Sequence, residues 1–197
     1  MAQARVKARR LSFLGGERFA VFAECLLTGV WIAVASLGVV TYPAAFAAGA
    51  RHLRRRTGHE GGGWTEFLAD FRTALRGGWG VGVAGWAVAA VVWVDVLAAR
   101  AGLPGGPLVG AVGVFALIGA VVALLRAAAV WAPGDSWRAL LAAAGRRTVL
   151  DPAGSFLVVC GLGVVALSAM FVAPLAVPVL GAVAAAAVAV EERYRNR

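Results

Sequence analysis

The sequence predicts an all-α protein that crosses a membrane several times. Of its 197 residues, 61% are hydrophobic and only 15% are charged, which is far less polar than a water-soluble domain. Residues Phe19–Ala50 contain a single charged residue, Glu24, and about 20 apolar residues already suffice for a helix to cross a bilayer. Since further runs of this kind follow, we expect a polytopic bundle of transmembrane helices.

Five apolar segments have the length of a full membrane span. They are Phe19–Val40, Gly78–Ala98, Pro107–Val130, Pro152–Phe171 and Pro174–Val190. Prolines begin three of them, where the missing backbone N–H costs a helix nothing. Pro178 lies one turn inside the last segment, so we expect that helix to bend there.

Basic residues are spread unevenly over the connections between these segments. Five precede the first segment, six lie in Arg51–Trp79 and four in Leu125–Thr148, whereas Ala99–Gly106 holds only one. Short loops rich in arginine and lysine stay in the cytoplasm. We therefore expect the N-terminus, both basic connections and the C-terminal tail (191–197) on the cytoplasmic side of the plasma membrane.

The first apolar segment leaves two topologies open. If both flanking basic stretches are cytoplasmic, residues 19–50 must leave the cytoplasm and return, yet they make only about 48 Å of helix, short of two spans of ~30 Å. We favour a full helix, a turn near Gly38–Tyr42, and a returning half-helix that starts at Pro43 and continues through Arg51–Arg56. The alternative is a single crossing with an external N-terminus.

Two amphipathic segments precede the second and fourth spans, and we expect both to lie as helices in the cytoplasmic interface. In the first, apolar residues recur on one helical face: Trp64, Phe67, Leu68, Phe71 and Leu75. Polar residues face the other way: Glu66, Asp70, Thr73 and Arg76. In the second, Trp137 begins the same spacing, with Asp135 or Ser136 as the N-cap.

The amphipathic segments also indicate an internal repeat. Shifting the first segment by 73 residues (137 − 64) places Trp64 on Trp137. We therefore expect one membrane domain over residues 1–197, with a basic N-terminus at 1–18. It consists of a broken first segment and two copies of an interfacial helix plus hairpin: 19–56, 64–130 and 135–190.

Three pieces of the first 80 residues form a recognisable pattern. They are the turn Val39–Ala45, which holds Thr41 and Pro43, the basic stretch Arg51–Arg56, and Phe67–Arg72 on the interfacial helix. The pattern resembles the YesL family of bacterial membrane proteins, which has no settled activity and is often encoded beside carbohydrate ABC transporters. One position differs from the family pattern: this chain has Gly38 where the family usually has the first proline of the turn. The resemblance implies an accessory or regulatory role in carbohydrate uptake, with sugar ABC transporter subunits as partners.

Three ionisable residues lie within or at the ends of apolar segments: Glu24, Asp95 and Arg126. Charged groups at membrane depth are costly and are therefore functional candidates. Glu24 could bind a proton or cation, or it could pair with an arginine such as Arg126. Asp95 lies near the external end of its helix, where water or Arg100 could neutralise it. We expect Arg126 to reach the interface with its long side chain.

Three tryptophans recur every seven residues along one stripe of the second span: Trp79, Trp86 and Trp93. They could form a wall for sugar stacking, but we favour packing and anchoring because two of them fall at the level of aromatic belts. Gly78, Gly82 and Gly85 oppose them with GxxxG spacing. Gly78 and Gly82 are therefore a candidate contact with a second copy of the chain.

No pattern of catalytic or metal-binding residues is present in the sequence. His52 and His59 flank an arginine run without a carboxylate or cysteine at ligand spacing, and Cys25 and Cys160 lie in separate apolar runs. Gly61–Gly63 follows no strand and is not a phosphate loop. We expect no enzyme activity, no cofactor and no metal. The basic clusters fit the bilayer surface, so we expect no nucleic-acid partner.

Two functions remain open. The protein is either a non-enzymatic accessory of carbohydrate uptake or a small transporter in its own right. A partner would dock on the first amphipathic helix, at Glu66, Phe67, Asp70, Phe71 and Arg72, unless that helix only anchors the bundle. A transporter should place several polar groups at the midplane, where Glu24 is nearly alone, so we favour the accessory.

Overall fold

The computed structural model describes residues 22–58, 62–102, 105–171 and 173–196. Within these residues every regular element is a helix, and no strand occurs. Residues 22–35 form the first helix, and the turn η1 (Ser36–Gly38) follows it. The remaining helices are α2 (Tyr42–Thr57), α3 (Trp64–Arg100), α4 (Gly106–Val130), α5 (Trp137–Leu150), α6 (Pro152–Phe171) and α7 (Ala173–Arg195).

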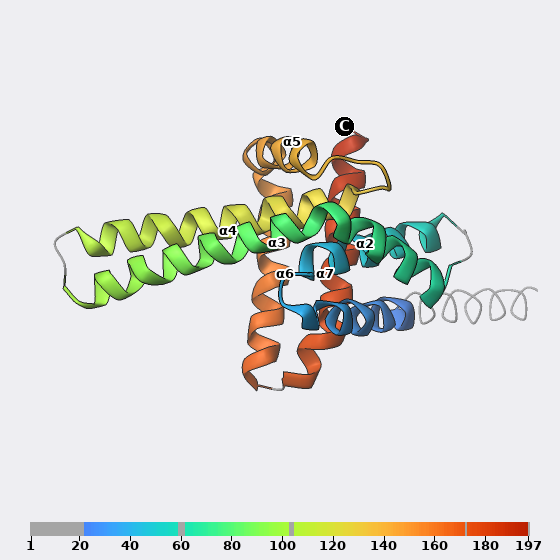
Figure 1. The fold of residues 1–197 in the computed structure, drawn as a ribbon, viewed down its shortest axis with the longest axis horizontal. Helices are drawn as coiled ribbons and strands as arrows, with labels where there is room; N and C mark the ends of the chain where they lie inside the picture. Colours follow the sequence, from blue (N-terminus) through green and yellow to red (C-terminus); the bar gives the residue numbers. More distant parts are fainter. Residues whose placement is uncertain (1–21, 59–61, 103–104, 172, 197) are drawn as a thin grey trace, which may run out of the picture.

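Two helical hairpins dominate the molecule. Helices α3 and α4 form one, and α6 and α7 form the other (Figure 1). The hairpins run crosswise, and α5 lies across the end of α6 and α7 (Figure 1). Helix α2 packs against α3, α4 and α7, so it lies where the two hairpins meet.

Three helices are long and apolar enough to cross a membrane: α3, α4 and α6. The first helix is apolar too, but the described part, Phe22–Gly38, is shorter. The predictions of an all-helical fold and of apolar helices with spanning length are therefore confirmed. Among the described residues, three of the five predicted full spans lie in helices that are both long enough and apolar enough to cross a membrane.

The predicted break in the first apolar segment is present. After η1, Val39 adopts a φ of 59°, a left-handed value that a β-branched residue rarely takes. The hydroxyl of Thr41 donates a hydrogen bond to the carbonyl oxygen of Ala35 at 2.6 Å, which closes the turn. Pro43 then occupies the first turn of α2, where a proline fits without loss of a hydrogen bond.

The predicted boundary between the first interfacial helix and the following span is wrong. Helix α3 continues without interruption through Gly77 and Gly78 for 37 residues. The reason is tertiary packing, because the buried ring of Trp137 lies on these glycines and its indole N–H donates to the carbonyl oxygen of Ala74 at 3.1 Å. Such contacts outweigh the roughly 1 kcal/mol that a glycine costs a helix.

The predicted start of the fourth span, at Pro152, is confirmed. Helix α5 ends at Leu150 and α6 begins at Pro152, since a proline within a continuous helix would clash with the preceding turn. Ser136 is the N-cap of α5 but makes no side-chain hydrogen bond. Asp135 instead accepts a hydrogen bond from the backbone N–H of Ala132 at 2.9 Å.

Glycines allow the closest helix contacts within the chain. A methyl group at Gly82 would overlap the carbonyl oxygen of Val40, and one at Gly181 would overlap that of Cys25. At Gly29 a Cβ atom would lie 2.6 Å from the carbonyl oxygen of Val177, so the first helix packs directly on α7. Because Gly78 and Gly82 are covered by the same chain, they are not presented to a second copy.

Candidate functional site

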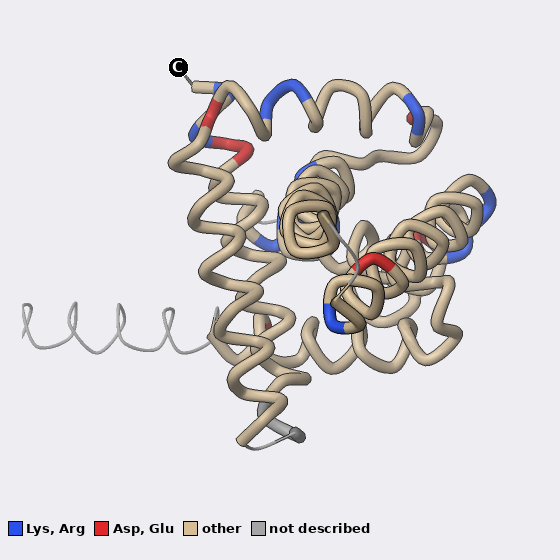
Figure 2. The backbone as a smooth tube through the Cα atoms, turned by 90° about the vertical axis from the view of Figure 1, so that its left-hand side faces the viewer, with Lys and Arg blue, Asp and Glu red and all other residues tan. Residues whose placement is uncertain are grey.

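Charged residues gather where the two hairpins meet, and the shafts of the hairpins are almost free of them (Figure 2). Between Arg76 and Arg126 only Asp95 and Arg100 are charged, and between Asp151 and Glu191 no residue is. The meeting region is therefore the only extended polar part among the described residues. Two clusters of buried ion pairs lie in it.

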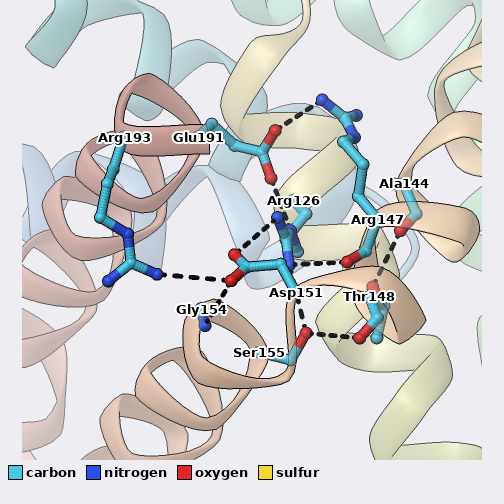
Figure 3. A network of polar contacts seen from close by, with 9 residues as sticks. All are labelled: Arg126, Ala144, Arg147, Thr148, Asp151, Gly154, Ser155, Glu191 and Arg193. Atoms are coloured by element: carbon cyan, nitrogen blue, oxygen red, sulfur yellow. Dashed lines mark hydrogen bonds and ion pairs between the residues drawn. The ribbon is translucent and has the colours of Figure 1, made fainter. Parts of the chain in front are cut away.

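Arg126 is the centre of the first cluster (Figure 3). Its side chain is fully buried; Nε lies 2.5 Å from Oε1 of Glu191 and Nη2 lies 3.4 Å from Oδ2 of Asp151. Nη1 donates hydrogen bonds to Oγ of Ser155 and to the carbonyl oxygen of Arg147, both at 3.2 Å. One guanidinium thus joins α4 to α5, α6 and α7, and the prediction that it reaches the interface is wrong.

Two further arginines complete this cluster from its outer side. Arg147 Nη1 lies 2.5 Å from Oε2 of Glu191, and Arg193 Nη2 lies 3.5 Å from Oδ1 of Asp151. Asp151 also accepts a hydrogen bond from the backbone N–H of Gly154 at 3.3 Å, so it caps the start of α6. Buried carboxylates are costly unless they are paired, and here each contacts two guanidinium groups.

The second cluster consists of Glu24 with His52 and Arg56, and of Asp70 with Arg51 and Arg55. Glu24 does pair with an arginine, as one alternative predicted, but the arginine is Arg56 and not Arg126. The Glu24 carboxylate lies 2.7 Å from Nε2 of His52 and 3.0 Å from Nη2 of Arg56. His52 is 1% exposed, and its ring meets that of Trp31 edge-on at 5.0 Å. The pair joins the first helix to α2.

Asp70 lies inside the protein, not on the predicted exposed face of α3. Its carboxylate forms ion pairs with Arg51 and, at 3.1 Å, with Arg55. Phe67 is also fully buried. Residues three apart share one face of a helix, and this face of α3 packs on α2. Of the other predicted docking residues, Glu66 and Arg72 are exposed and Phe71 is half-buried.

Arg54 stabilises the end of α4. Its Nη2 donates to the carbonyl oxygen of Trp131 at 2.5 Å, where a cation complements the helix dipole. Burial, followed by the charges of Arg51 and Arg195, lowers the pKa of Arg54, while two nearby carboxylates oppose the shift. A cavity of about 160 Å³ lies beside it. Two arginines and two glutamates contribute to its lining: Arg54, Arg195, Glu191 and Glu192.

The remaining predicted residues lie apart from both clusters. Asp95 is half-buried between α3 and α4, with Gly113 opposite its carboxylate, and within the described residues it forms no ion pair with Arg100. The three tryptophans that recur every seven residues, Trp79, Trp86 and Trp93, are 53–62% exposed, so they face outward. They do not line an enclosed sugar site. Trp86 donates its indole N–H to the carbonyl oxygen of Val39 at 2.9 Å.

Sequence reasoning missed three buried members of the clusters: His52, Asp151 and Glu191. Asp151 precedes a proline and Glu191 ends an apolar run, which in sequence is the ordinary pattern of a solvated helix end. The sequence did contain one signal for these partners, namely that acidic residues are rare: the chain has only 10 aspartates and glutamates against 19 basic residues. Buried arginines must find their partners within that small set.

Comparisons with protein-family models, with curated proteins and with solved structures found no match to this chain. The resemblance to the YesL family therefore rests on the motifs of the first 80 residues.

Proposed function

We propose that the protein is a multi-pass protein of the plasma membrane that acts as a non-enzymatic accessory or regulatory subunit, with its charged region in the cytoplasm. The main support for this proposal is that the buried charged side chains form ion pairs within the chain and are not left open to a substrate. Arg126, Glu24 and Asp70 each form ion pairs with other helices of the same chain. Arg126 joins the two hairpins, Glu24 joins the first helix to α2, and Asp70 joins α3 to α2.

An accessory role agrees better with the polar groups than transport does. A substrate path would need polar side chains at mid-depth of the hairpins, yet the charges on the shaft of the α3–α4 hairpin are Asp95 and Arg100, near its tip. A reaction centre would need a nucleophile or base beside an open cavity. The carboxylates of both clusters are already held by guanidinium or imidazole groups.

We propose carbohydrate uptake as the process, and this part rests on the family resemblance. The partner would be a cytoplasmic loop or the ATPase of a sugar ABC transporter. In the first turns of α3, Glu66 is exposed, and we place the partner contact on it. Asp70 and Phe67 are buried and do not contribute to such a contact directly.

Co-purification from the native membrane tests the docking proposal. Glu66→Lys should lose the transporter subunits, whereas Glu192→Lys, an exposed charge reversal on α7, should retain them. Glu66 also caps the helix, because its carboxylate accepts a hydrogen bond from the backbone N–H of Gly63 at 2.8 Å. Glu66→Gln removes the charge but keeps an amide oxygen that can accept the same hydrogen bond, so it tests the charge alone. If the parent protein recovers no transporter subunit, or if it alone moves a sugar into liposomes, the accessory proposal fails.

Cysteine labelling tests the proposed orientation. Single cysteines at Arg56, Gly62 and Arg146, introduced after Cys25 and Cys160 are replaced by serine, should react only with a reagent that enters the cell. A cysteine at Gly102, in the α3–α4 turn, should react from outside. Labelling of the first three from outside intact cells would contradict the orientation.

A further inference from the structure

We propose that a groove on α3 binds one anionic phospholipid, with its phosphate on Arg72 and Arg76 and an acyl chain along Trp79 and Val83. The groove has a volume of about 550 Å³. One wall is the turn before α2, at Val40 and Thr41, and the other is a face of α3.

The groove changes from cationic to apolar along a single helix face. Arg72, Arg76, Trp79 and Val83 are spaced by four, three and four residues, so they lie one above the other. From Arg72 to Val83 the helix rises about 16 Å. A phospholipid shows the same order from its phosphate to the middle of its acyl chains, and tryptophan is enriched at the boundary between the two.

The two arginines of the groove are available to a ligand. The arginines of α2 are committed within the chain, Arg51 and Arg55 to Asp70 and Arg56 to Glu24. Arg72 and Arg76 are exposed and form no ion pair with any residue that the structure describes. A guanidinium presents several N–H donors in a plane that matches phosphate oxygens.

The apolar half of the groove favours a lipid over a free phosphate ion. Trp79 is 60% exposed and Val83 48% exposed, and both belong to a helix that is long and apolar enough to cross a membrane. An inorganic phosphate would engage the arginines alone. A zwitterionic lipid would bring a cationic head group toward two arginines, so the site should select a net negative head group.

Tryptophan quenching by brominated lipids tests the site. The full-length protein, in bilayers that mix brominated phosphatidylglycerol with phosphatidylcholine, should prefer the anionic lipid by about thirtyfold, from roughly fivefold per arginine near a surface. Arg72→Gln with Arg76→Gln should reduce the preference to near unity, and Arg72→Lys with Arg76→Lys should keep part of it. The matched control removes two other exposed arginines, Arg138→Gln with Arg146→Gln on α5.

The outcomes separate the proposal from its alternatives. Loss of the preference in the groove variant alone supports it, provided that the variant elutes as the same monodisperse species. Equal loss in groove and control variants, or no loss in either, would overturn it. If inorganic phosphate displaces phosphatidylglycerol, the site is a free-anion site and the lipid proposal is wrong.

Discussion

Replacing Arg126 by methionine should destabilise the protein by about 3 kcal/mol. Removing one partner of a buried ion pair costs roughly 3–5 kcal/mol, because it leaves an uncompensated charge in the interior. Here Glu191 keeps Arg147 at 2.5 Å and Asp151 keeps Arg193 at 3.5 Å. Neither carboxylate is left alone, so we expect the lower end of that range.

The free energy of unfolding can be measured in mixed micelles titrated with sodium dodecyl sulfate and followed by tryptophan fluorescence. Arg146→Met is the control, since Arg146 is exposed and surface changes stay within about 0.5 kcal/mol. Arg193→Met should cost about 0–1 kcal/mol, as its side chain is 41% exposed and such pairs contribute little.

A double variant removes both charges of the Arg126–Glu191 ion pair. Arg126→Met with Glu191→Met replaces both charges by apolar groups, which is often nearly neutral for a buried pair. It should therefore be more stable than Arg126→Met alone. If Arg126→Met unfolds together with the Arg146→Met control, the ion pairs do not hold the helix junction and the reasoning is refuted.

Three further variants test the packing with the same unfolding assay. Gly82→Leu should cost about 1–3 kcal/mol because its side chain would meet the backbone of the turn before α2, whereas Gly80→Leu faces open space and should cost less. Gly181→Val should separate the first helix from α7 and expose the former to proteolysis, and Gly163→Val, also in open space, should not. Trp137→Ala should cost about 3–5 kcal/mol through the cavity left against α3.

Local signals in the sequence predicted much of the fold. The starts of α2, α4 and α6 were predicted from Pro43, Pro107 and Pro152, and each proline lies in the first turn of its helix. These predictions hold because a proline acts on its own backbone, through its fixed φ and its missing N–H. The turn after the first apolar helix was also predicted from the residues of the turn itself.

The membership of the charge clusters could not be predicted in this way. Glu24 and His52 are 28 residues apart, and Arg126 and Glu191 are 65 apart. Periodicity reports which face of a helix is apolar, but it does not report which helix covers that face. Asp70 shows the consequence: its place opposite the apolar stripe suggested solvent, and the arginines of α2 cover it instead.

The angle between the two hairpins also depends on contacts between residues that are far apart in the sequence. Each hairpin holds a helix whose uncharged length is close to the ~30 Å of a bilayer core, yet the hairpins run crosswise (Figures 1 and 2), so both cannot stand along one membrane normal in this arrangement. The contacts between the hairpins include the ion pairs of Arg126, which bridge α4 to α6 and α7, and the packing of α2 on α3, α4 and α7. A bilayer that aligned both hairpins would act directly on these contacts. The cost of Arg126→Met, measured in micelles and again in bilayers, therefore reports on the ion pairs and on the geometry they maintain.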